Sequence, residues 1–261
     1  MRTIRMAVCM GALAAATQLV ACSVPGSAAL SPALSPSVTS APHAVDDTHL
    51  NPTCAQAARD GGRVFALQAA ASRIRIFVFR AGRAAKLGHN HVLSAPSFDG
   101  YFYLPEAGPG ASTFDLCFRL DQLAIDAPAE RAGLGPAFDS QVSQESIDGT
   151  REHMLGANNM QAERYPLVRI HALQVVGEAP KFAARLAVEM HGTRREMWVP
   201  LHVTGLPEQV NVSGSLVLNQ TDFGITPYSV LGGLLAVQDA VVVEFNLVGV
   251  PWDFHPSGRS E

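Results

Sequence analysis

The 261-residue sequence is short of the features that mark several classes of function. Its 19 basic and 23 acidic residues are spread along the chain, so no basic stripe exists that would favour nucleic acid as a partner. There is no Gly-x-Ser-x-Gly motif and no phosphate-binding loop, and therefore no reaction class and no cofactor is predicted. Beyond the N-terminal region there is no second long apolar run, so any membrane attachment is expected there.

The N-terminus has the pattern of a secretory signal. Arg2 and Arg5 precede an apolar stretch at residues 6–13, which is too short to span a bilayer as a helix. Residues 19–22, Leu-Val-Ala-Cys, resemble the lipobox of bacterial lipoproteins, in which cleavage leaves the cysteine as an acylated N-terminus. We therefore predict a signal peptide at residues 1–21 and a lipid anchor on Cys22. An ordinary signal cleaved near Ala28 or Ala29 is the alternative.

An acylated Cys22 would place the protein in the bacterial cell envelope, with its folded part in the periplasm. Acylation attaches more than one fatty chain, which stable anchoring requires, because each buried methylene contributes only ~0.8 kcal/mol. The next residue, Ser23, is not aspartate, and by resemblance to sorting in Gram-negative bacteria this favours the outer membrane.

Cysteine is scarce, with four in the whole chain. Cys9 would leave with the signal and Cys22 would carry lipid, so Cys54 and Cys117 would remain in an oxidising compartment, where disulfides persist. We predict that these two pair, with a stabilisation of roughly 4 kcal/mol from closing the long loop between them. Two separate free thiols are the alternative.

The composition changes along the chain and divides it into segments. Residues 22–62 are rich in Ala, Ser and Pro with few large apolar groups, which predicts a tether that cannot bury enough surface to fold. Residues 63–250 contain short alternating segments separated by turn residues, the pattern of antiparallel strands with one buried face. Residues 251–261 form a tail.

About eight such strands, without the spacing of parallel units, predict an all-β domain: a single antiparallel sheet curled into a barrel or sandwich. Cys117 alternates with Phe114, Leu116 and Phe118 and should point away from their face. Residues 150–160 break the alternation and are expected to form a short helix or an ordered loop.

Several segments resemble the YceI-like family of bacterial envelope proteins. The best of them are VSGSLVLNQTDFGIT at residues 212–226 and VQDAVVVEFNLV at 237–248, with further likeness at 150–172 and 186–203. This resemblance covers most of residues 72–250. It implies an up-and-down, lipocalin-like barrel and a long apolar ligand such as a polyisoprenoid.

The apolar stripe is therefore the predicted functional element, although a filled core would give the same pattern. We expect these eight apolar residues to contact the ligand: Phe114, Leu116, Phe118, Leu186, Val188, Met190, Val199 and Leu201. Association costs roughly 4–15 kcal/mol, and each buried methylene returns only ~0.8 kcal/mol. A lipid of about twenty carbons or more is therefore expected, bound without catalysis. The oligomeric state is left open.

Two histidines stand one residue apart in KLGHNHVLS, residues 86–94. If they lie on a strand, His89 and His91 share a face. They could contact the polar end of the ligand, or simply be hydrogen-bonded or exposed at the barrel mouth. A metal site is incomplete with two ligands, since zinc usually takes three or four from the protein, and no metal is predicted. The alternative function is a metal- or redox-accessory protein that uses this pair.

Overall fold

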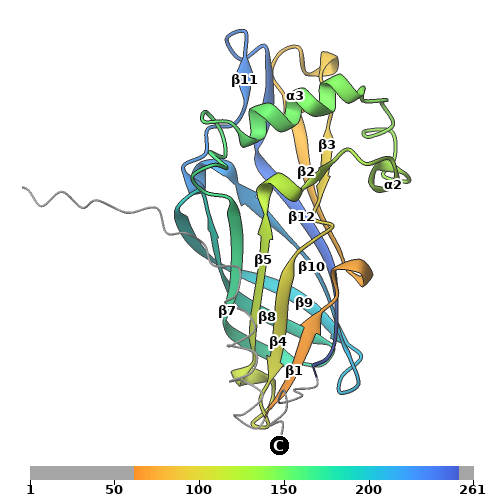
Figure 1. Ribbon diagram of the computed structural model, residues 1–261, viewed down its shortest axis with the longest axis vertical. Helices are drawn as coiled ribbons and strands as arrows, with labels where there is room; N and C mark the ends of the chain where they lie inside the picture. Colours follow the sequence, from red (N-terminus) through yellow and green to blue (C-terminus); the bar gives the residue numbers. More distant parts are fainter. Residues whose placement is uncertain (1–61, 253–261) are drawn as a thin grey trace, which may run out of the picture. The chain divides into compact units, whose positions relative to one another are not determined.

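The computed structural model describes residues 62–252, which form an antiparallel sheet that closes on itself (Figure 1). This confirms the predicted all-β, lipocalin-like barrel. The signal peptide, Cys22, the tether up to residue 61 and the last nine residues lie outside the described residues, so the predictions about them stay predictions.

Eight strands form the closed wall, each pairing with the next and the last pairing with the first. They are β1 (Arg63–Leu67), β4 (Asp99–Leu104), β5 (Thr113–Arg119), β7 (Leu167–Glu178), β8 (Lys181–Met190), β9 (Thr193–Thr204), β10 (Val210–Asn219) and β12 (Leu235–Pro251). The long strand β12 pairs with β1 near its end and with β2 (Arg73–Ala81) along its middle. From β2 the sheet continues through β3 (His91–Ser94) to β6 (Ala124–Ile125), and β11 (Ser229–Val230) forms a hairpin with the start of β12.

The helices among the described residues are short. Two of these are α-helical, α2 (Pro128–Arg131) and α3 (Gln144–Leu155). The others are single 3-10 turns: η1 (Ala69–Ala71), η2 (Ala85–Leu87), η3 (Pro109–Ala111), η4 (Leu120–Gln122) and η5 (Gln220–Phe223). Within residues 62–252, none of these helices has the length and hydropathy needed to cross a membrane.

Helix α3 is the element expected at residues 150–160, but it begins six residues earlier. The Ser143 side chain accepts a hydrogen bond from the Ser146 backbone N–H (3.2 Å), which is an N-cap that fixes the first turn. Near its other end, Arg151 donates to the backbone carbonyls of Asp121 (3.1 Å) and Leu123 (2.8 Å). These bonds hold α3 across one end of the barrel (Figure 1).

The residues of β2 alternate between the interior and the outer face of the barrel, as predicted, but part of the outer face of this strand is also buried. Ile74, Ile76 and Val78 face the barrel interior, while Phe77 points outward. Phe77 is nevertheless buried, because Phe138, from the segment between α2 and α3, packs its ring 5.7 Å away. A second small core therefore lies outside the wall, and it fixes the segment that follows β6.

Cys117 lies on β5 between two inward residues and is not part of the interior surface. Its predicted partner, Cys54, lies outside the described residues. The disulfide therefore stays a prediction.

Candidate ligand cavity

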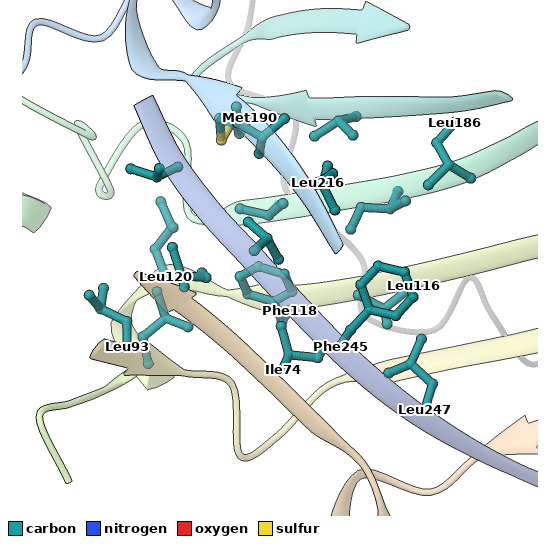
Figure 2. Close-up of a pocket in the computed structure, with 18 of the residues that line it drawn as sticks. Ile74, Leu93, Leu116, Phe118, Leu120, Leu186, Met190, Leu216, Phe245 and Leu247 are labelled. Atoms are coloured by element: carbon teal, nitrogen blue, oxygen red, sulfur yellow. The ribbon is translucent and has the colours of Figure 1, made fainter. Parts of the chain in front are cut away.

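An apolar cavity of about 490 Å³ lies inside the barrel (Figure 2). This volume falls in the range of about 300–1,000 Å³ that is common for small-molecule sites. Aliphatic and aromatic side chains make up most of its surface, and no Asp, Glu, Lys or Arg of the described chain lines it. The interior can therefore solvate a hydrocarbon but offers no counter-charge to an ion.

Strand periodicity generates the cavity surface. On β7, Val168, Ile170 and Ala172 point inward at every second position. A bulge between Ala172 and Gln174 then shifts the register, so that Val175 also points inward. Ala172 and, on the next strand, Ala184 are small residues on this lining, and small side chains leave volume where larger ones would fill the barrel.

Seven of the eight apolar residues predicted to contact the ligand line this cavity. They are Phe114, Leu116, Phe118, Leu186, Val188, Met190 and Leu201. Val199 is the exception: it is fully buried in the surrounding core and does not reach the cavity. Alternation assigns a residue to a face of the sheet, but it does not say whether neighbouring side chains cover it.

A large part of the lining was not predicted from the sequence. The inward residues of β2 and β12 also form it: Ile74, Ile76, Val78, Val241, Val243, Phe245 and Leu247. Their alternation was visible in the sequence. What could not be seen was that both strands lie against the same cavity as β5, since that depends on how the barrel closes.

The two ends of the cavity differ in polarity. Most of its polar lining residues gather at the α3 end: His91, Ser146, Thr150, His153, Asn159, Gln220 and Tyr228. There the rings of His153, on α3, and Tyr228, just before β11, lie 4.8 Å apart between centroids. The opposite end is lined by Pro109, Ser112 and Leu206. The cavity thus extends from the loops at one end of the barrel to those at the other.

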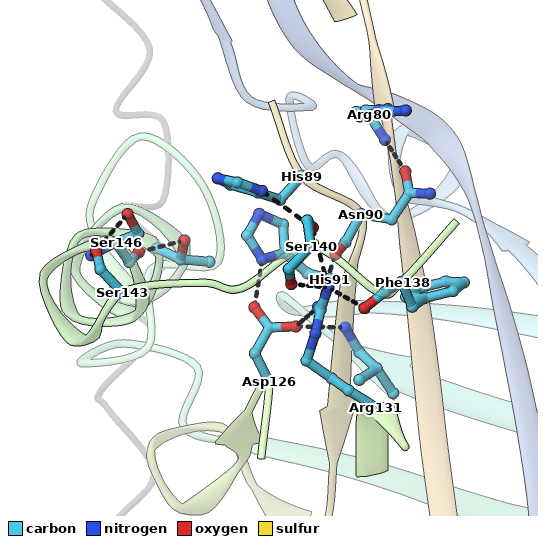
Figure 3. A network of polar contacts seen from close by, with 12 residues as sticks. Arg80, His89, Asn90, His91, Asp126, Arg131, Phe138, Ser140, Ser143 and Ser146 are labelled. Carbon is cyan, nitrogen blue, oxygen red and sulfur yellow. Dashed lines mark hydrogen bonds and ion pairs between the residues drawn. The ribbon is translucent and has the colours of Figure 1, made fainter. Parts of the chain in front are cut away.

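A buried polar network adjoins the α3 end of the cavity (Figure 3). His91 begins β3 and lines the cavity, and its Nδ1 lies 2.6 Å from a carboxylate oxygen of Asp126. Asp126, whose side chain is fully buried, also accepts a hydrogen bond from the Val92 backbone N–H (3.0 Å) and pairs with Arg131. Arg131 donates further to the carbonyl oxygens of Asn90 and Phe138.

These contacts determine which nitrogen of His91 is available. Burial alone would raise the pKa of Asp126, but hydrogen bonds from His91, the Val92 N–H and Arg131 outweigh it and lower that pKa. An ionised carboxylate is only an acceptor, so the proton of the short contact belongs to Nδ1 of His91. Within residues 62–252, Nε2 of His91 has no hydrogen-bond partner. In the neutral ring Nε2 is an acceptor.

His89 is close to His91 but plays a different part. The two rings are 6.4 Å apart between centroids, yet His89 does not line the cavity, and its Nδ1 lies 3.2 Å from the Ser140 hydroxyl. Asn90, between them, is fixed by bonds to the Arg80 N–H and the Ala137 carbonyl. Of the two predicted histidines, only His91 therefore reaches the cavity.

The described residues offer no metal cluster at this network, and its His–Asp pair is not bonded to a nucleophile, since the Ser140 hydroxyl contacts His89 instead. No group of three or more His, Cys, Asp or Glu in the described chain is arranged to hold a metal ion. A His–Asp pair also occurs in hydrolases, where the histidine activates a serine or cysteine. In residues 62–252 no hydrogen bond joins His91 to such a side chain.

Comparisons with known proteins identify the family. A model of the YceI-like domain matches residues 67–249. Comparison with curated protein sequences gave no match. Among solved structures, Burkholderia cenocepacia BcnA is similar, with a TM-score of 0.51 and 12% identity over 70% of this chain and 98% of that chain. A Campylobacter jejuni YceI protein gives a TM-score of 0.40 and 11% identity over 62% of this chain and 84% of its own. At these identities the likeness to BcnA shows the fold alone.

Proposed function

Because this chain belongs to the YceI-like family, we propose that it binds or carries a long apolar lipid inside the barrel, without catalysing a reaction. Membership of this family suggests a hydrophobic ligand. The observation that carries the proposal is the cavity of about 490 Å³ with no charged lining residue among those described. A packed core would leave no such volume, because protein interiors contain few voids larger than a water molecule.

The dimensions of the cavity favour a long ligand. Ser112 and Leu120 both line it and stand at the two ends of β5, roughly 27 Å apart along extended chain. A ligand of about twenty carbons would fill such a length. It would bury enough apolar surface to offset an association cost of roughly 4–15 kcal/mol. An isoprenoid-like chain, as the family resemblance implies, meets this requirement.

His91 supports a finer proposal about the end of the ligand. Its Nε2, which is a hydrogen-bond acceptor in the neutral ring, lies at the polar end of an otherwise apolar cavity. A hydroxyl group on the ligand would donate a hydrogen bond to Nε2, whereas a bare hydrocarbon would leave this nitrogen without a partner. We therefore propose that the apolar ligand ends in a hydroxyl group, or in another hydrogen-bond donor, which lies at the α3 end of the cavity. The metal- or redox-accessory alternative has no comparable observation in its favour.

The location of the protein in the cell envelope is part of the same proposal. An acyl anchor on Cys22, with the barrel in the periplasm and attached to the outer membrane, would keep a lipid carrier close to its source. The anchor can be tested directly by the mass of the mature N-terminal peptide. A mass without acyl groups would remove the anchor from the proposal and leave lipid binding by the barrel unaffected.

Native mass spectrometry tests the function. The chain, produced in a bacterial envelope and purified gently, should show an additional mass that matches a lipid and is lost on denaturation. Ala184→Phe places a ring in the cavity and should remove that mass. Ala183→Phe, at the neighbouring position that does not line the cavity, is the matched control and should retain it. A wild-type protein that never carries a lipid and takes up none from vesicles would refute the proposal.

A further inference from the structure

Two leucines at the α3 end of the barrel are almost fully exposed. Leu87, in η2, is 78% exposed, and Leu231, in the turn between β11 and β12, is 74% exposed. They are the most exposed large apolar side chains of the described residues, since the next, Val217 on the barrel wall, is 62% exposed. Single exposed apolar residues are common and need no explanation, but two on adjoining loops at the end of a ligand cavity form a pattern.

The loops that carry the two leucines are joined to each other. The Ala84 backbone N–H donates to the Leu234 carbonyl (2.9 Å). Gly82 has a φ of +89°, and a Cβ at this position would lie 2.5 Å from the same carbonyl oxygen, so the close approach requires glycine. In Figure 1 the β11 hairpin and the end of β2 project beyond α3 at the same end of the molecule. We refer to residues 82–88 and 231–234 together as the rim.

The charges of the rim have one sign. Arg83 and Lys86 are exposed beside Leu87, and neither forms an ion pair within residues 62–252. No Asp or Glu occurs in residues 79–91 or in residues 226–238. The rim therefore combines exposed leucines with uncompensated positive charge, which is the composition of surfaces that insert apolar groups below anionic lipid head groups.

The hairpin that carries part of the rim also contributes to the cavity lining. Tyr228 and Val237, which flank the β11 turn in the sequence, both line the cavity. Because the Val237 backbone N–H donates to the Tyr228 carbonyl (3.0 Å), a ligand leaving past them would emerge at the base of the hairpin that carries Leu231.

From these observations we propose that the rim docks on an anionic lipid bilayer, with Leu87 and Leu231 inserted and Arg83 and Lys86 at the head groups. In this arrangement the cavity exchanges its ligand with the bilayer through the α3 end. The exchange step rests on the proposed lipid-binding function, whereas the docking itself depends only on the rim.

Vesicle co-sedimentation tests the docking, using the full chain with Cys22→Ser so that no acyl group is attached at the predicted site. The vesicles are phosphatidylcholine alone, or equal parts of phosphatidylcholine and phosphatidylglycerol. We expect binding to the anionic vesicles that weakens with salt. Leu87→Asp and Leu231→Asp should each lower the partition coefficient at least about tenfold. Arg83→Gln and Lys86→Gln should each lower it about fivefold, on anionic vesicles only.

Val217→Asp is the matched control, because it replaces an exposed apolar residue on the wall, away from the rim, and it should bind as the parent chain does. The docking is overturned if the parent chain does not bind anionic vesicles at low salt, which would favour a protein partner for the rim. It is also overturned if the two leucine variants bind like the parent, or if Val217→Asp is equally impaired.

Native mass spectrometry of the same variants separates this proposal from lipid binding in the cavity. A parent chain that retains a bound lipid but does not bind anionic vesicles would refute the docking alone. Chains that bind vesicles through the rim but never carry a lipid would refute the proposed function and leave the docking in place.

Discussion

The cavity wall and the polar network at the start of β3 lie side by side, but they are stabilised in different ways. The wall depends on many apolar side chains whose contribution is non-directional and scales with buried area. The network depends on one fully buried carboxylate, Asp126, that holds His91, Val92 and Arg131 through directed bonds. Substitutions in the wall should therefore change the volume available to the ligand, whereas substitutions in the network should change the stability of the fold or the choice of ligand.

The largest effect on stability is expected in the packed part of the interior. Phe223 is 1% exposed and does not line the cavity, but it packs behind two residues that do, Val188 and Ile225. Phe223→Ala should lower the free energy of unfolding by about 3–5 kcal/mol, as is usual for a filled core. Phe118→Ala, whose ring lines the cavity (Figure 2), should cost roughly half as much, because fewer packing contacts are lost.

The retention of bound lipid should show the opposite order for these two variants. Phe118→Ala should release lipid faster in native mass spectrometry, and Phe223→Ala, once folded, should retain it. Equal losses of stability for both, with unchanged retention in Phe118→Ala, would mean that the interior is an ordinary packed core.

Asp126→Asn should lower the free energy of unfolding by an amount comparable to that of Phe223→Ala. It removes the charge that compensates Arg131, which is only 10% exposed, and breaking a buried pair typically costs about 3–5 kcal/mol. Asparagine tolerates the positive φ of this position (52°) nearly as well as aspartate, so the backbone is preserved. Asp121→Asn is the control, because it breaks an exposed pair with Arg119 and should cost only about 0.2–1 kcal/mol. Urea unfolding at neutral pH measures both; similar values would show that the network is not essential for stability.

The stability difference between the wild type and Asp126→Asn should depend on pH. The folded-state pKa of Asp126 is lowered from the ordinary value of 3.8, so its ionised form stabilises the fold above that pH. This contribution should decline as the pH falls below 3.8 through the folded-state pKa. Urea unfolding of both proteins across this range should show the two stabilities converging. A constant difference would mean that folding does not lower the pKa of Asp126.

The sequence predicted the barrel well because alternation reports which face of a strand is buried. Leu116 and Phe118 could be assigned to the interior from their spacing alone. The same pattern could not show that Val199 is covered by its neighbours or that Phe77 is buried on the outer side, since both depend on contacts between distant segments.

The polar network could be predicted only in part. The sequence singled out His91, but Asp126 and Arg131 gave no local signal, because they lie 35 and 40 residues further along the chain and reach His91 only after β6 pairs with β3. The start of α3 was missed for a simpler reason. Ser143 is a recognisable N-cap, but its helix has no apolar stripe to draw attention to it, and none of its residues is fully buried.

The smallest expected effect concerns the choice of ligand at His91. In His91→Asn the side-chain amide can still donate to Asp126, near the position of Nδ1, but nothing replaces Nε2, which is the acceptor of the neutral ring. A hydrogen bond of about 0.5–1.5 kcal/mol should then be lost, so a chain alcohol of about twenty carbons should bind roughly two- to tenfold more weakly. The methyl ether of the same alcohol has no donor, and its affinity should not change. Competition between the two ligands, followed by native mass spectrometry, isolates this one bond. If the variant weakens both ligands equally, His91 shapes the cavity and does not recognise a hydroxyl group.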